Sequence, residues 1–290
     1  MAVSSTARLF LVASLLVAAT ACSEGDLLEQ RPVSVREPAG YQEGTPAPLL
    51  VVLHGYGLTA QLETAYLGVD AVADANGMLV VAPEGTKNAE GKQYWNATKA
   101  CCAPDGANDV DDSAYLAAVI DDVSTRYEVD DRRVFVLGHS NGGFMAYRMA
   151  CDHADVIAAV ASLEGAMTSA KGGCDPSGPV SVLEIHGTAD KVIKYEGGAS
   201  PTADATYPGA EQTVADWAEL SGCDTPAVAG TPPNRTLMDG LPPATVQTYG
   251  GCDDDAVAEL WTQPDGSHQP PLNSTFTAQV VEFLLAHPKS

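Results

Sequence analysis

Arg133-Val-Phe-Val-Leu-Gly-His-Ser-Asn-Gly-Gly143 is the stretch of sequence that decides the fold. Its apolar part, 134–137, is uninterrupted, which is typical of a buried strand. The next five residues match the pattern G-x-S-x-G, in which a strand turns sharply into a helix around a serine. Here that serine is Ser140, and the glycines on either side provide the room that the turn needs. Because a helix-like segment follows at 144–151, we interpret Ser140 as an exposed nucleophile rather than as part of a glycine-rich strand end.

Apolar segments alternate with helical patterns along the rest of the chain. Apolar runs predict strands at 49–53, 78–82, 156–163, 180–185, 246–249 and 257–261, and helical spacing predicts helices at 62–75, 109–127, 210–220 and 274–286. This alternation predicts an α/β fold with a mostly parallel sheet covered by helices on both faces. A length of 290 residues, 45% of them hydrophobic, fits a single domain. In such folds the active site lies at the carboxyl ends of the strands.

Ser140 needs a general base and an acid from that edge of the sheet. In serine hydrolases of this architecture the order along the chain is serine, acid, histidine. His268, in a loop between the last strand and the last helix, is the predicted base, whereas His287 is interpreted as a solvated tail residue. Asp190, which follows the strand at 180–185, is the predicted acid. Ser140 would then attack an acyl carbon, His268 would transfer the proton and Asp190 would orient His268.

We assign structural roles to some other polar residues near this edge, and we use only the backbone N–H groups of two more. His186 is interpreted as a packed histidine at a strand end, Glu184 as a strand-edge or surface charge, and 253–255 as a solvated turn. The predicted oxyanion-hole donors are the backbone N–H groups of Asn141 and Tyr56. The segment around Tyr56 also has the composition of an ordinary glycine turn.

The start of the chain predicts export. Arg8 precedes an apolar run, 9–19, that is too short to span a bilayer comfortably and is typical of a secretory signal. Cys22 stands where a bacterial lipoprotein carries its lipid anchor, but Ala19 replaces the usual leucine, so lipid anchoring and simple cleavage with release both stay open. We assign 1–22 as a signal peptide of the lipoprotein type, 23–47 as a polar tether and 48–290 as the catalytic domain.

Six further cysteines fit an oxidising compartment, in which an even set forms disulfides. They are Cys101, Cys102, Cys151, Cys174, Cys223 and Cys252. Short intervening segments favour the pairs Cys151–Cys174 and Cys223–Cys252. The adjacent Cys101 and Cys102 would then form a vicinal bridge, unless the other two pairs are wrong. Because the sequence has no C-x-x-C motif, a zinc site is not predicted.

The charge balance excludes some partners. Lys and Arg number 15 against 38 Asp and Glu, which gives a net charge of −23. Such a surface repels nucleic acid and anionic lipid headgroups, so a neutral or hydrophobic substrate fits better, although the charge could equally be an adaptation to salt. The acidic run 108–112 is interpreted as a helix N-terminus, since the turn glycine and closing glutamate of a calcium loop are missing. We predict no metal and no cofactor.

Trp95 is the candidate substrate contact. It lies in a long loop, 85–108, that we expect to approach the active edge of the sheet. An indole ring there could stack on a substrate or could anchor its own loop. The sequence leaves both roles open.

Five segments of the chain occur together in one known family. They are Leu53-His-Gly-Tyr-Gly57, Trp95 followed by Cys101-Cys102, Asp111-Asp112 at a helix start, Gly138-His-Ser-Asn-Gly-Gly143, and Ile185-His-Gly-Thr-Ala-Asp190. From Leu49 to about Pro271 the chain thereby resembles the polyhydroxybutyrate depolymerase and feruloyl or acetylxylan esterase group of α/β-hydrolases. The resemblance implies the triad Ser140, Asp190 and His268, with Tyr56 and Asn141 as oxyanion donors. The family often has an aromatic residue and Pro-Gly after its catalytic histidine, whereas Gln269-Pro-Pro271 follows here. The resemblance therefore does not define the wall of the site on the substrate side.

The predicted function is that of an exported serine esterase, outside the cell or in the cell envelope. It is expected to hydrolyse a small-molecule or polymeric carboxylic ester, either feruloyl, acetyl or hydroxyalkanoate, through an acyl-enzyme on Ser140. The alternatives are an acetylxylan esterase or a peptidase on the same fold, and a catalytically inactive surface-binding lipoprotein. Nucleic acid is not an expected partner, and membrane attachment is expected only through a lipidated Cys22.

Overall fold

The computed structural model describes residues 1, 24–103, 110–168, 173–200 and 204–290 of the chain. Residues 2–22 of the predicted signal peptide, Cys22 included, lie outside these residues, so export and lipid anchoring stay predictions. Among the described residues, no helix is long and apolar enough to cross a membrane.

A nine-stranded sheet forms the centre of the domain. In spatial order its strands are β1 (Val35–Arg36), β3 (Leu79–Val81), β2 (Ala47–Leu53), β6 (Val129–His139), β7 (Ala159–Leu163), β8 (Ser181–Gly187), β13 (Ala258–Gln263), β12 (Ala244–Tyr249) and β11 (Val228–Arg235). The strands from β3 to β13 run parallel, and β1, β12 and β11 pair antiparallel at the edges. The prediction of a mostly parallel sheet is confirmed.

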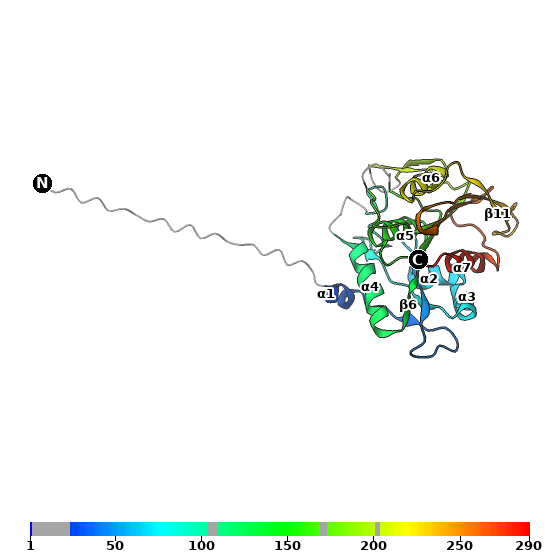
Figure 1. Cartoon of the computed structure of the whole chain (residues 1–290). Coiled ribbons are helices and arrows are strands. Elements are labelled where there is room, and N and C mark those ends of the chain that lie inside the picture. Colours follow the sequence, from blue (N-terminus) through cyan, green and yellow to red (C-terminus); the bar gives the residue numbers. More distant parts are fainter. Residues whose placement is uncertain (2–23, 104–109, 169–172, 201–203) are drawn as a thin grey trace.

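Helices cover both faces of this sheet (Figure 1). They are α1 (Glu24–Gln30), α2 (Ala60–Leu67), α3 (Val69–Asn76), α4 (Asp112–Arg126), α5 (Asn141–Asp152), α6 (Ala210–Leu220) and α7 (Phe276–Ala286). Buried side chains of α4, α5 and α6 form one apolar cluster with the sheet, and those of α3 and α7 form a second. The sheet therefore separates two core layers, as expected for strands that are apolar on both sides.

The helix predicted at 62–75 is two helices. Gly68 separates α2 from α3 with φ 65°, in the left-handed region that favours glycine, and its N–H bonds to the carbonyl of Thr64. As a separate short helix, α2 places Glu63 beside the loop that follows β2, where its carboxylate accepts the N–H of Gly55.

The segment predicted as a polar tether, 23–47, is part of the folded domain from α1 onward, so that prediction is wrong. Leu27 and Leu28 pack against the core cluster under α4. Arg31 Nη1 lies 2.6 Å from the buried carboxylate of Asp112, and β1 pairs with β3. Packing of two adjacent leucines, one ion pair and a strand pairing thus attach a segment whose other residues are mostly polar.

The two edges of the sheet are short or interrupted. β1 has two residues. β11 contains Pro232 and Pro233, which have no N–H to donate, and its register against β12 shifts between Ala229 and Asn234. Two hairpins and a turn complete the described elements: β4 (Thr86–Lys87) with β5 (Gln93–Tyr94), β9 (Gly197–Ala199) with β10 (Thr206–Pro208), and the exposed 3-10 turn Asp253–Asp255.

Candidate active site

Ser140 occupies a sharp turn between β6 and α5. Its backbone has φ 55° and ψ −119°, a strained conformation for a residue with a side chain, and its N–H bonds to Leu163 O at 2.7 Å. The flanking glycines are required by contact. A Cβ on Gly138 would lie 2.0 Å from the carbonyl oxygen of Gly142, and a Cβ on Gly142 would lie 2.1 Å from Leu53 O. The turn therefore has the form that the G-x-S-x-G pattern predicts.

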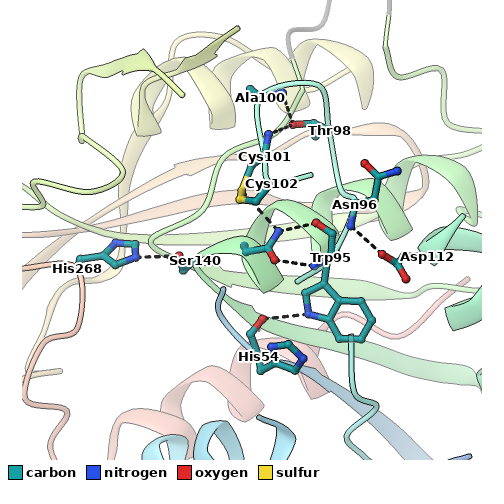
Figure 2. Close-up of a disulfide and its surroundings, with 11 residues drawn as sticks. His54, Trp95, Asn96, Thr98, Ala100, Cys101, Cys102, Asp112, Ser140 and His268 are labelled. Carbon is teal, nitrogen blue, oxygen red and sulfur yellow. Dashed lines mark hydrogen bonds between the residues drawn. A yellow bond between two sulfur atoms is a disulfide. The ribbon is translucent and has the colours of Figure 1, made fainter. Parts of the chain in front are cut away.

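Ser140, His268 and Asp190 lie in a hydrogen-bonded line, although they come from three separate loops. His268 Nε2 is 2.8 Å from Ser140 Oγ, and His268 Nδ1 is 2.6 Å from Asp190 Oδ2. Figure 2 shows the His268 ring directed at the serine hydroxyl. The other carboxylate oxygen of Asp190 accepts the N–H groups of Val192 and Ile193 at 2.7 and 3.0 Å, which fixes its orientation.

The charge of Asp190 is maintained despite its burial. Burial alone would raise the pKa of Asp190, but the hydrogen bond and charge of His268, together with the backbone N–H of Val192, hold that pKa below its usual value. An ionised carboxylate on Nδ1 leaves Nε2 of the same ring free to accept a proton from Ser140 Oγ. The arrangement can thus activate a hydroxyl as a nucleophile.

The two predicted oxyanion-hole residues both lie beside Ser140. Asn141 is the first residue of α5, so its backbone N–H has no carbonyl within the helix to bond to. The loop that carries Tyr56 passes over the serine, since a Cβ on Gly55 would lie 3.5 Å from Ser140 Cβ. The Tyr56 side chain points to the loop at β4, where its hydroxyl accepts from Asn88 at 3.0 Å.

Trp95 does not offer its ring to a substrate, and the predicted stacking role is wrong. Its side chain is 0% exposed. Its indole N–H donates to His54 O at 3.0 Å, and its backbone N–H and carbonyl pair with the side-chain amide of Asn141 at 2.7 and 2.8 Å (Figure 2). The tryptophan therefore anchors its loop to the start of α5, and it does so next to Ser140.

A vicinal disulfide closes the same loop. Cys101 and Cys102 are joined, and Asn141 Nδ2 lies 3.5 Å from Cys101 Sγ (Figure 2). The loop is also attached to α4, because Asn96 N–H donates to Asp112 at 2.8 Å. Elsewhere the structure contains both disulfides predicted from local spacing, Cys151–Cys174 and Cys223–Cys252.

A second buried network lies behind Asp190. His186 Nδ1 is 3.0 Å from Glu184 Oε1, and its Nε2 is 2.8 Å from Ile193 O and 3.3 Å from Glu164 Oε2. Glu184 is fully buried, so its interpretation as a surface charge is wrong, whereas the packed role of His186 is confirmed. Burial alone would lower the pKa of His186, but Glu164 and Glu184 raise it to about 9.

Glu164 was missed at the sequence level. It follows β7 at the carboxyl edge with φ 55°, and both its oxygens accept the N–H of Gly187 at 3.0 Å. The edge position that identified Asp190 was a signal for Glu164 as well. Glu164, His186 and Asp190 place possible metal-ligand atoms within 4.8 Å of one another. Hydrogen bonds within the protein already engage these atoms, so the cluster fits a structural network better than a metal site.

The fold and the arrangement around Ser140 define the chain as an α/β-hydrolase. The model of the esterase family, described as "Putative esterase", matches residues 26–232, and the chain belongs to this family. In structure it is similar to an acetyl xylan esterase from Aspergillus awamori, with a TM-score of 0.59, 15% identity, and coverage of 87% of this chain and 94% of that one. At that identity the likeness shows the fold.

Two relatives are similar over most of the described domain. The chain is 34% identical over 221 residues to "Putative esterase NocK" of Nocardia uniformis subsp. tsuyamanensis, which is 73% of this chain and 55% of that protein. It is 30% identical over 245 residues to "Feruloyl esterase B" of Piromyces equi, which is 82% of this chain and 42% of that protein. The chain thus spans about half the length of the curated relatives that it matches.

Proposed function

We propose that this protein is a serine carboxylic-ester hydrolase that forms an acyl-enzyme on Ser140. The observation that carries the proposal is the hydrogen-bonded line from Ser140 Oγ through His268 to Asp190, with the serine held on a strained turn. Membership of the esterase family supports the same reaction class.

In the proposed first step, Ser140 Oγ attacks the ester carbonyl carbon while its proton passes to His268 Nε2, 2.8 Å away. The tetrahedral intermediate then breaks its bond to the alkoxy oxygen, which takes the proton from His268 and leaves as the alcohol. Water attacks the resulting acyl-enzyme with His268 again as the base. The acid is released and Ser140 regains its proton. Asp190 stabilises the imidazolium that forms in each step.

The negative oxygen of the tetrahedral intermediate needs donors that are already in place. We propose the backbone N–H groups of Asn141 and Tyr56 for this role. The position of Asn141 at the N-terminus of α5 supports it, because the helix dipole favours negative charge there. The hydrogen bonds between the side-chain amide of Asn141 and the backbone of Trp95 would keep this end of the helix in a fixed orientation.

The substrate class that we propose is a neutral ester. The net charge of −23 disfavours anionic polymers, and the names of relatives point to feruloyl esters and acetylated xylan. With Trp95 buried, that residue supplies no aromatic surface, so we propose that other residues near Ser140 set the size of the acyl group. Three disulfides support an oxidising compartment, and we propose that the protein acts outside the cytoplasm, either released or anchored through Cys22.

The test uses the full chain with Ser140→Ala as the control. A fluorophosphonate probe should label the wild-type protein at Ser140, and the label should be absent from the control. Hydrolysis of p-nitrophenyl acetate, methyl ferulate, acetylated xylan and a hydroxybutyrate ester then identifies the acyl group, and matched amides measure peptidase activity. Absence of both labelling and ester hydrolysis would refute the proposal. Faster cleavage of the amides than of the esters would identify the protein as a peptidase instead of an esterase.

A further inference from the structure

His139, the residue before Ser140, is buried between the two loops that form the candidate site. Its side chain is 3% exposed. Its Nδ1 lies 3.3 and 3.4 Å from the two carboxylate oxygens of Glu63, and its Nε2 lies 3.0 Å from the backbone carbonyl of His268. The ring thus connects helix α2 to the loop that carries the proposed general base.

The partners of His139 define its charge. A carboxylate and a carbonyl both accept hydrogen bonds, so both ring nitrogens of His139 must carry hydrogen, and the ring is an imidazolium. His54 has the opposite pattern: its Nε2 accepts the N–H of Gly85 at 2.9 Å, so the ring is neutral. Burial alone would lower the pKa of both histidines. It does so for His54, whereas the hydrogen bond and charge of Glu63 raise the pKa of His139 above its usual value.

Glu63 has a second contact in the site. Its Oε2 accepts the backbone N–H of Gly55 at 3.1 Å, and Gly55 directly precedes Tyr56. The Glu63 side chain is completely buried. One carboxylate therefore touches both the loop proposed to supply an oxyanion donor and the histidine that holds His268.

Helix α2 is attached to the His268 loop at a second point. Tyr66 lies one turn after Glu63, on the same side of the helix. Its ring packs 5.5 Å from the ring of His139, and its hydroxyl donates to Pro270 O at 2.9 Å. Together, His139 and Tyr66 hold the backbone on both sides of Gln269.

We propose that Glu63 and His139 are positioning residues for the ester hydrolysis proposed above: the ion pair fixes the backbone of His268 relative to the Tyr56 loop. The ring of His268 is oriented by Asp190 from one side, while its main chain is held by His139 from the other. Loss of the pair removes the contact that holds the main chain of His268 itself, and proton transfer from Ser140 loses its fixed distance. The inference rests on the proposed function.

The pair also predicts an alkaline limit to turnover. The titratable groups that face His139 are Glu63 and Tyr66 from α2, and Asp190 and His268 from the loops after β8 and β13. Asp190 adds to the effect of Glu63 by favouring the charged ring. The pKa of His139 is raised in the folded protein, so the stabilisation from its ion pair with Glu63 is complete below about pH 6.5 and is lost as the pH rises through the raised value. We therefore expect kcat to fall as His139 loses its proton at alkaline pH.

The experiment measures kcat and KM against pH for Glu63→Gln, His139→Gln and the double variant, with Glu282→Gln on α7 as a matched control at an exposed position. Glu63→Gln should lower kcat by about 10- to 100-fold, the range for a lost hydrogen bond to a charged group, with KM changed less than about threefold. The fall of kcat at alkaline pH should occur at a lower pH in Glu63→Gln than in the wild-type enzyme. His139→Gln keeps a donor for His268 O and should abolish the fall of kcat at alkaline pH. The double variant should be more active than Glu63→Gln alone.

Two outcomes overturn the inference. One is an active wild-type enzyme whose kcat does not fall as the pH is raised to the highest value at which the protein stays folded, a result that needs no variant to fold. The other is a folded Glu63→Gln enzyme with wild-type kcat and pH profile. Failure of the proposed function gives a different result, since the wild-type chain would then neither label at Ser140 nor hydrolyse any ester.

Discussion

Replacement of Trp95 with phenylalanine should destabilise the protein without changing its choice of ester. The smaller ring removes the indole N–H that pairs with His54 O, and an unpaired buried acceptor costs about 1–3 kcal/mol. Loss of the second ring of a fully buried side chain leaves a void that costs on the order of 1 kcal/mol more. The expected loss of about 2–4 kcal/mol corresponds to a fall in Tm of about 4–16 °C for a domain of this size.

The assay combines thermal unfolding with kinetics on two substrates. We expect Tm to fall as calculated, and KM for methyl ferulate and for p-nitrophenyl acetate to change by the same factor. Val228→Ala, at an exposed position of β11, should leave Tm and both KM values unchanged. An unchanged Tm with KM raised about three- to tenfold for the feruloyl ester alone would show that the indole ring contacts the substrate, and would refute the anchoring role.

Three further outcomes are expected. His268→Ala should lower kcat by about 10³-fold or more, whereas His287→Ala, at the end of α7, should change kcat little, as steady-state rates would show. Gly142→Ala should abolish activity or folding, because the added Cβ meets Leu53 O. The control Gly178→Ala should be tolerated, because a Cβ there meets nothing within 4 Å. Expression and activity assays would distinguish the two variants. The raised pKa of His186 gives stability that is complete below about pH 6.5 and is lost as the pH rises through about 9, so Tm should decline over that window; a Tm that rises there would contradict the buried ion pairs.

The elbow with Ser140, and the two residues that meet it, Asp190 and His268, could be predicted from the sequence because simple rules determine their positions. The contacts of Gly138 and Gly142 leave no room for another residue, so the pattern itself carries the geometry. The edge rule for parallel sheets places residues that follow different strands close together, which is why Asp190 and His268 could be named.

The errors concern residues whose role depends on what packs over them. Trp95 lies in a loop near the active edge, and only the fold shows that its ring is directed inward to His54 rather than outward to a ligand. The interpretation of Glu184 as a surface charge failed for the same reason, and no role was predicted for Glu63, because acidic side chains are seldom fully buried and no local pattern distinguishes these two. The segment 24–36 has too little periodicity to predict that it packs on α4.

The sheet edges affect how copies of this protein meet at high concentration. β11 lacks N–H groups at 232 and 233, and β1 is too short to serve as a template, so neither edge offers a second molecule a continuous row of backbone partners. The net charge of −23 adds long-range repulsion between molecules at neutral pH. Acidification to the isoelectric point, near pH 4.3, removes this net repulsion, but the two prolines still lack N–H donors. Crowded or acidified solutions should therefore favour amorphous precipitate over ordered fibrils built from the native sheet.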